Sequence, residues 1–144
     1  MLRKILLLVI ALWFLFFSVS AGAEELRYRD YEESMRTAGP ENKLVMVFFW
    51  ADWCFYCNKI RQEVFSEPAI HEIFDRDFLA VSVNVENDPE GLAGKYRARV
   101  LPTLTFLKPD GEIVGYWEGA ADKGTFLKIL EYLVTEVKAG EDES

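Results

Sequence analysis

The chain contains two cysteines, Cys54 and Cys57, which lie three positions apart. A disulfide between them would close a very small loop, so it would remove little entropy from the unfolded chain and would be a poor structural crosslink. The same spacing suits thiol-disulfide exchange. A thiolate at the first position can attack a substrate disulfide, and a thiol almost one helical turn later can resolve the mixed disulfide. The pair therefore predicts exchange chemistry.

Other uses of these cysteines fit the sequence less well. A zinc site needs four protein ligands, or three and a water, whereas this chain offers two cysteines and the single histidine His71. Covalent haem attachment requires a histidine directly after the second cysteine, and that residue is Asn58. No flavin or nicotinamide motif is present either. We therefore expect no metal and no cofactor, and an ordinary helical role for His71.

The elements around the cysteines are suited to positioning them. The run Leu44–Trp50 is continuously apolar, as expected of a strand covered on both faces. A helix is predicted from Cys54 to Phe65, because Cys57, Ile60 and Val64 recur at helical spacing. Cys54 then lies at the helix N-terminus, where unpaired amides and the helix dipole stabilise a thiolate.

The remaining pattern predicts a single α/β domain. Strands are expected at Phe78–Val85, Thr103–Leu107 and Ile113–Trp117, the last two joined as a hairpin through Pro109-Asp110-Gly111. Helices are expected over Leu26–Ala38, ended by Gly39-Pro40, then from Pro68 to Phe74, from Asp88-Pro89 to Tyr96, and from Asp122 to Lys138. Strands separated by helices run parallel and a hairpin adds an antiparallel pair. The result is a central mixed sheet flanked by helices on both faces.

The two ends of the chain are expected to lie outside this domain. Arg3 and Lys4 precede the apolar run Ile5–Phe17, and Ala21-Gly22-Ala23 follows as a cleavage site before Glu24, so residues 1–23 read as a signal peptide. An uncleaved membrane anchor is the alternative, although the apolar run falls short of the roughly 20 residues that cross a bilayer. The domain is expected over 24–139, with a disordered acidic tail at 140–144.

The charge of the chain excludes some partners. Its formal net charge is −8, and removal of residues 1–23 leaves 14 basic and 24 acidic residues, or −10. Nucleic acid and anionic lipid would repel such a surface. We expect no nucleic-acid partner, and contact with a membrane only if the N-terminal segment is uncleaved.

Two segments carry a family resemblance. The sequence WADWCFYCNK at 50–59 resembles the active-site stretch of thioredoxins, and KYRARVLPTLTFLKPDGEIVGYWEGA at 95–120 resembles their second half. The likeness covers roughly residues 26–138. VMVFFWADWC and the later VFSEPAI further resemble exported members of this superfamily, namely the C-terminal domain of the membrane thiol-disulfide interchange protein and single-domain periplasmic thioredoxins.

The resemblance implies a thioredoxin fold and assigns site residues. Cys54 would be the attacking thiolate and Cys57 the resolving cysteine. A substrate groove would be formed by Trp53, Phe55, Tyr56, Leu101, Pro102 and Gly119. In that groove Pro102 would be a cis-proline, and the backbone of Leu101 would pair with an extended substrate. A plain loop proline at 102, and a filler role for Phe55 and Tyr56, are the alternatives.

One departure from the family concerns proton transfer. Thioredoxins carry a buried aspartate six residues before the first cysteine, and here that position is Phe48. The lysine usually paired with it is replaced by Ser82. The proton relay is therefore missing or rebuilt. We expect slower resolution by Cys57 at neutral pH unless another acid, Asp52 or Glu63, takes over the role.

These observations predict a periplasmic thiol-disulfide oxidoreductase. The partners implied are oxidised protein thiols, which it would reduce, and a membrane electron donor of the thiol-disulfide interchange type. The uncharged Phe55-Tyr56 insert does not favour a strong oxidant, since oxidants of this superfamily tend to place a histidine there. A disulfide oxidase or isomerase is the alternative within the same chemistry. A binding or chaperone module with little redox turnover is the alternative outside it.

Overall fold

The computed structural model describes Met1 and residues 25–138. The expected signal peptide at 1–23, beyond Met1, and the expected acidic tail at 140–144 lie outside the described residues. Within residues 25–138, no helix is both long enough and apolar enough to cross a bilayer.

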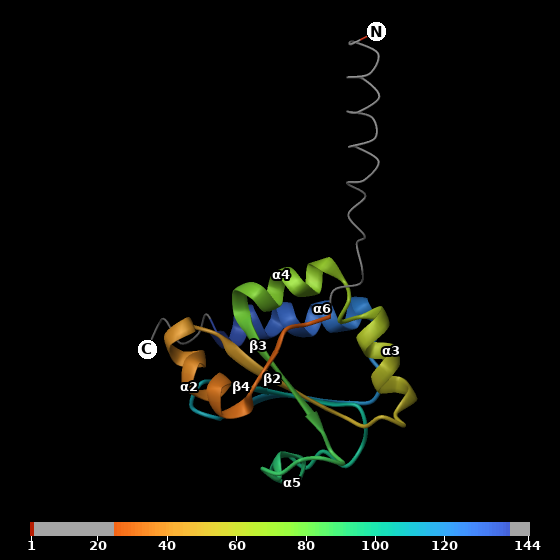
Figure 1. Ribbon diagram of the computed structural model, residues 1–144. Helices are drawn as coiled ribbons and strands as arrows, with labels where there is room; N and C mark the ends of the chain where they lie inside the picture. The colour runs from red at the N-terminus through yellow and green to blue at the C-terminus, as the bar shows by residue number, and fades with distance from the viewer. Residues whose placement is uncertain (2–24, 139–144) are drawn as a thin grey trace.

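A five-stranded sheet lies at the centre of the described residues (Figure 1). Its strands are β1 (Tyr28–Arg29), β2 (Leu44–Trp50), β3 (Phe78–Asn84), β4 (Thr103–Leu107) and β5 (Ile113–Glu118), in the order β1-β3-β2-β4-β5. β1 and β2 pair with β3 in parallel, whereas β4 is antiparallel to both β2 and β5. The predicted mixed sheet is confirmed, with the short strand β1 added at its edge.

Helices cover both faces of the sheet (Figure 1). On one face α3 (Phe55–Glu63), α4 (Pro68–Asp77) and α6 (Lys123–Tyr132) bury side chains such as Ile60, Ile70 and Phe126 against the sheet. On the other face α2 (Tyr31–Glu41) and α5 (Leu92–Lys95) contribute Tyr31 and Leu92. Each face of the sheet therefore has its own hydrophobic core. Alternate side chains of β2 point into one core or the other, since successive side chains of a strand point to opposite faces. The predicted α/β class is therefore confirmed.

The first predicted helix, Leu26–Ala38, is wrong at both ends. Tyr28 and Arg29 form β1, which exists because they pair with Ala80 and Val81 of β3. The helix begins only after Asp30, whose carboxylate accepts a hydrogen bond from the amide of Glu33 at 3.0 Å.

The expected stop at Gly39-Pro40 is also wrong, because α2 includes both residues and ends at Glu41. Pro40 lies in the last turn and has no amide to donate to the carbonyl four residues earlier, and the helix ends one residue later at Glu41. The helix closes at Asn42, which has a left-handed φ of 52° and donates its amide to the carbonyl of Gly39 at 2.9 Å.

Two later helices also differ from their predicted extent. The helix expected from Asp88-Pro89 is reduced to Leu92–Lys95, because Gly91 adopts φ 68° and interrupts the helical path. The Asp88 carboxylate instead accepts the amides of Leu92 and Ala93, at 3.0 and 2.7 Å. The last helix is α-helical over Lys123–Tyr132 and becomes the π-helix η1 over Leu133–Lys138. There the hydroxyl of Thr135 donates to the carbonyl of Glu131, the acceptor that its own amide would use in an α-helix.

Candidate functional site

The two cysteines lie where β2 passes into α3. β2 ends at Trp50, and a turn in which the amide of Cys54 donates to the carbonyl of Ala51 at 3.1 Å leads into the helix. Cys54 is the N-cap residue of α3 and Cys57 lies in its first turn. The two form a disulfide with a Cα–Cα distance of 5.3 Å.

The helix N-terminus directs a hydrogen-bond donor at the first cysteine. The amide of Cys57 donates to the sulfur of Cys54 at 3.2 Å. Cys54 is 4% exposed, whereas Cys57 is completely buried. In the reduced protein this amide would stabilise a thiolate on Cys54, which is the sulfur nearer to solvent. The arrangement therefore suits attack by Cys54 and resolution by Cys57.

Three large side chains form an exposed rim around the disulfide. The exposed fractions of Trp53, Phe55 and Tyr56 are 69%, 72% and 53%. The rings of Phe55 and Tyr56 meet edge to face with centroids 5.5 Å apart. These residues supply apolar surface beside the reactive sulfur and no charge.

The loop before β4 lies beside the end of β2. Phe49 is paired with Thr103 in the antiparallel register, so Leu101 and Pro102 extend past the strand end toward the turn that holds Cys54. The Leu101-Pro102 peptide bond is cis. The structure thus has the cis-proline that the resemblance implied at this position.

Gly119 lies against the same loop. Its amide donates to the carbonyl of Pro102 at 2.8 Å. Its φ is +85°, and a Cβ built on it would meet no atom within 4 Å. The backbone conformation favours glycine, and the space above it is open. Leu101 and Gly119 are half-buried and Pro102 is buried, so the open space above Gly119 lies beside the cis-proline loop.

The two carboxylates expected to transfer protons lie at the surface. The amide nitrogen Nδ2 of Asn84 donates to the carboxylate of Asp52 at 3.5 Å. Glu63, the last residue of α3, has a side chain 63% exposed and lies 3.9 Å from the ammonium of Lys59. A proton-transfer role for either residue stays a prediction.

The position of the missing family aspartate is filled by an aromatic core. Phe48 is completely buried and packs edge to face on Phe65, with centroids 5.2 Å apart. Ser82, its partner on β3, accepts a hydrogen bond from the indole nitrogen of Trp50 at 2.8 Å.

One charged residue near the cysteines was missed from the sequence. The guanidinium of Arg61 lies 3.8 Å from the centroid of the Trp50 ring and 5.3 Å from that of Phe48. Its Nε lies 3.7 Å from the carboxylate of Glu25. Arg61 follows Cys57 by four positions on α3, so the two share a helix face. The four-residue spacing from Cys57 is the feature of the sequence that could have indicated Arg61. Its packing on Trp50 could not have been predicted, because it depends on the fold.

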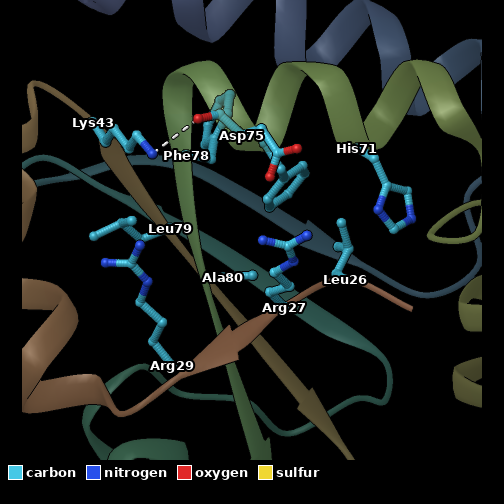
Figure 2. A pocket seen from close by; sticks show the side chains of 10 residues that line it. Leu26, Arg27, Arg29, Lys43, His71, Asp75, Phe78, Leu79 and Ala80 are labelled. Atoms are coloured by element: carbon cyan, nitrogen blue, oxygen red, sulfur yellow. Dashed lines mark hydrogen bonds between the residues drawn. The ribbon is translucent and has the colours of Figure 1, made fainter. Parts of the chain in front are cut away.

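A separate hollow of about 160 Å³ lies at the β1 edge of the sheet (Figure 2). Several cations line it, and neighbouring groups engage them. Lys43 donates to the carbonyl of Asp75 at 2.9 Å, and Arg29 donates to Glu41 at 2.8 Å. His71, also in its lining, lies with Nε2 2.7 Å from the carbonyl of Phe65. Over the described residues, no three histidine, cysteine or acidic side chains gather in a way that could hold a metal.

Known proteins are similar to this chain in sequence and in overall structure. Residues 31–134 match the family described as thioredoxin-like domain. A thioredoxin of Porphyra purpurea is 33% identical over 91 residues, which cover 63% of this chain and 80% of that protein. The thiol:disulfide interchange protein DsbD of Photorhabdus laumondii is 34% identical over 97 residues, covering 64% of this chain and 17% of that protein. The solution structure of a thioredoxin from Thermus thermophilus superposes with a TM-score of 0.70 at 34% identity, over 78% of this chain and 90% of that one.

Proposed function

The chain belongs to the thioredoxin-like domain family and is a thiol-disulfide oxidoreductase of the thioredoxin type, and from this premise we propose that it reduces disulfides of exported proteins. The observation that supports the reducing direction is the exposed, uncharged insert between the cysteines. Phe55 and Tyr56 bring no cation to the sulfur of Cys54, and the donor that the described residues direct at this sulfur is the amide of Cys57 at the helix N-terminus. A less stabilised thiolate makes the dithiol the better electron donor.

The catalytic cycle follows from the two positions. The Cys54 thiolate attacks one sulfur of the substrate disulfide, forming a mixed disulfide and releasing the other substrate sulfur as a thiolate. The Cys57 thiol then gives up its proton and attacks the Cys54 sulfur, forming the intramolecular disulfide and releasing the second substrate thiolate. Two electrons pass to the substrate, and two protons complete its thiols. The disulfide form described here is the product of that cycle.

The cycle requires a reductant, and we infer that this is another protein dithiol. The sequence carries no flavin or nicotinamide motif, so electrons reach Cys54–Cys57 by a second disulfide exchange. The similarity to the thiol:disulfide interchange protein DsbD supports a membrane donor of that type. The proposed periplasmic location is supported by the N-terminal sequence pattern. Arg3 and Lys4 precede an apolar run, and Ala21-Gly22-Ala23 follows it, as in a signal peptide that directs export.

Equilibration with glutathione tests the direction. We expect a midpoint potential at or below about −230 mV, in the range of thioredoxins and the more reducing glutaredoxins, whereas a value near about −120 mV would make the protein an oxidant. The Cys57→Ser variant should trap substrates as mixed disulfides through Cys54, and the Cys54→Ser variant serves as its control. Mass spectrometry of the protein recovered from the periplasm tests export and cleavage before Glu24. Retention in the cytoplasm would contradict the proposed compartment.

A further inference from the structure

An open groove of about 710 Å³ runs between β5 and the segment that follows α5. One wall is formed by Ile113, Tyr116 and Glu118 of β5. The other is formed by Lys95, Arg97 and Arg99. The groove contains none of the residues that hold the disulfide.

The groove carries positive charge on an acidic protein. Three cations line it, against the single carboxylate of Glu118, although the chain as a whole has a net charge of −8. The hydroxyl of Tyr116 donates to that carboxylate at 2.8 Å. Lys95 is held in place by donating to the hydroxyl of Tyr31 at 2.9 Å. Arg97 and Arg99 are exposed, and neither has a carboxylate partner among the described residues.

Apolar surface lies between these charges. Ile113 is 51% exposed and Tyr116 is 44% exposed, and both belong to a strand at the edge of the sheet. Val100, which follows the basic segment, is 48% exposed. A groove with one largely apolar wall on an edge strand and a cationic wall opposite suits an extended peptide that carries acidic side chains.

The backbone of Arg97 holds its side chain at this wall. Its φ is +55°, a left-handed conformation that favours glycine. The Arg97 carbonyl lies 3.1 Å from the hydroxyl of Tyr116 and shares its single proton with the nearer Glu118 carboxylate, a contact that ties the turn to β5. An arginine at a position suited to glycine is a local cost, and such costs concentrate at functional surfaces.

One end of the groove reaches the reactive site. Arg99 precedes the cis Leu101-Pro102 bond by two residues, and Glu118 directly precedes Gly119. Glu118 is also paired with Thr103, the residue after Pro102. A substrate segment that lies against Leu101 can therefore continue along β5 into the groove.

We propose that this groove binds an acidic, extended segment flanking the disulfide of the substrate protein, and so selects acidic substrates. The proposal rests on the proposed function, since it names the substrate class of the same site. Arg97 and Arg99 supply the charge that recognises the carboxylates, and Tyr116 and Ile113 supply the apolar contact. The active-site disulfide and the electron flow are unchanged by it.

Three disulfide-bonded peptides that differ only in three flanking residues, all Glu, all Gln or all Lys, test the selection. We expect the reduced protein to react with the Glu peptide about tenfold faster than with the Gln peptide at low ionic strength, and slowest with the Lys peptide. In about 0.5 M salt, charges are screened over a few ångströms, so the faster reaction with the Glu peptide should nearly disappear.

Variants locate the preference. Arg97→Gly keeps a residue suited to φ +55° and removes only the side chain, and Arg99→Gln removes the second charge. The double variant should reduce the Glu-to-Gln ratio to about twofold, whereas the matched control Arg36→Gln, an exposed arginine on α2, should leave it unchanged. An unchanged ratio in the double variant, or no preference in the unaltered protein, would overturn the proposal.

A small uncharged disulfide and a cysteine-free Glu peptide separate this proposal from the proposed function. Failure to reduce the small disulfide would refute the reductase role. Fluorescence anisotropy with the cysteine-free peptide measures the groove alone, and tighter binding of the Glu than the Gln form is expected whatever the direction of electron flow. Equal binding of the two forms would refute the groove while leaving the reductase intact.

Discussion

The guanidinium of Arg61 lies 3.8 Å from the centre of the Trp50 ring, on the helix that carries Cys57. The same group lies 5.3 Å from the ring of Phe48, the residue that occupies the position of the family aspartate. A cation packed on two aromatic rings therefore lies close to a site from which the buried acid has been lost. Since Arg61 and Cys57 are four positions apart on one helix face, we expect the cation to stabilise negative charge that develops on the resolving sulfur.

Removal of this cation should slow the resolving step. In Arg61→Gln we expect the mixed disulfide formed through Cys54 to persist roughly fivefold longer, since a partly exposed charge interaction is worth about 1 kcal/mol at most. Arg61→Lys should retain most of the rate. Rapid mixing with a fluorescent disulfide peptide measures the lifetime. Lys59→Gln, an exposed cation two positions away on the same helix, is the control, and equal lifetimes in the Arg61 and Lys59 variants would show that Arg61 has no such role.

A methyl group at Gly119 should affect both stability and substrate access. The φ of +85° disfavours alanine, so Gly119→Ala should lower the free energy of unfolding by about 1–2 kcal/mol. A Cβ at this position meets no atom of the chain within 4 Å, so it projects into the open surface beside Pro102. We expect slower reduction of a disulfide-bonded peptide and an unchanged rate with a small disulfide. Equal slowing with the peptide and with the small disulfide would indicate that the substitution disturbs the cysteine site itself and does not block access of the peptide beside Pro102.

The central strands and the reactive cysteines could be predicted from the sequence because each depends on local pattern. The apolar run Leu44–Trp50 predicted β2 with its observed bounds, and Pro109-Asp110-Gly111 marked the hairpin. The Cys54–Cys57 spacing carried the chemistry. These signals need no knowledge of what lies across the sheet.

The features that were missed depend on contacts between distant segments. β1 consists of two residues, and it exists because Tyr28 and Arg29 pair with β3. The position of Arg61 on the Trp50 ring requires that β2 and α3 pack together. The basic groove joins Arg97 and Arg99 to β5, and the bond from Tyr116 to the Arg97 carbonyl spans nineteen positions. Sequence spacing alone cannot show such neighbours.

The buried pair formed by Tyr31 of α2 and Tyr96, the residue after α5, should make the free energy of unfolding sensitive to alkaline pH. The hydroxyls of Tyr31 and Tyr96 lie 2.6 Å apart, and burial, together with this bond, raises the pKa of Tyr96 to about 12 from the ordinary 10.0. Between these values the unfolded chain releases the tyrosine proton and the folded chain retains it. The free energy of unfolding should therefore fall as pH rises from 10 to 12.

Urea titrations at pH 8, 10 and 11 measure this dependence. Tyr96→Phe should be less stable than the unaltered protein at pH 8, because the hydroxyl pair is broken. Above pH 10, however, its free energy of unfolding should fall less steeply than that of the unaltered protein. Tyr132→Phe, at a residue that is 61% exposed, is the control and should follow the unaltered curve. A decline in Tyr96→Phe as steep as in the unaltered protein would assign the alkaline loss to other groups.

Gly115 lies in a tightly packed environment and Gly94 in an open one, so substitution by alanine should affect the free energy of unfolding differently at the two positions. At Gly115 in β5 a Cβ would lie 3.0 Å from Cδ2 of Phe106 and 3.4 Å from Cδ2 of Leu133. Phe106 is completely buried and packs on Phe78, so it has little room to move, and overpacking should lower the free energy of unfolding of Gly115→Ala by about 1–3 kcal/mol. At Gly94 in α5 a Cβ would meet nothing within 4 Å, and Gly94→Ala should be neutral or raise stability by up to about 1 kcal/mol through helix propensity. Urea unfolding of both variants measures the difference, and a Gly115→Ala protein as stable as Gly94→Ala would show that the packing of β5 on the π-helix is loose.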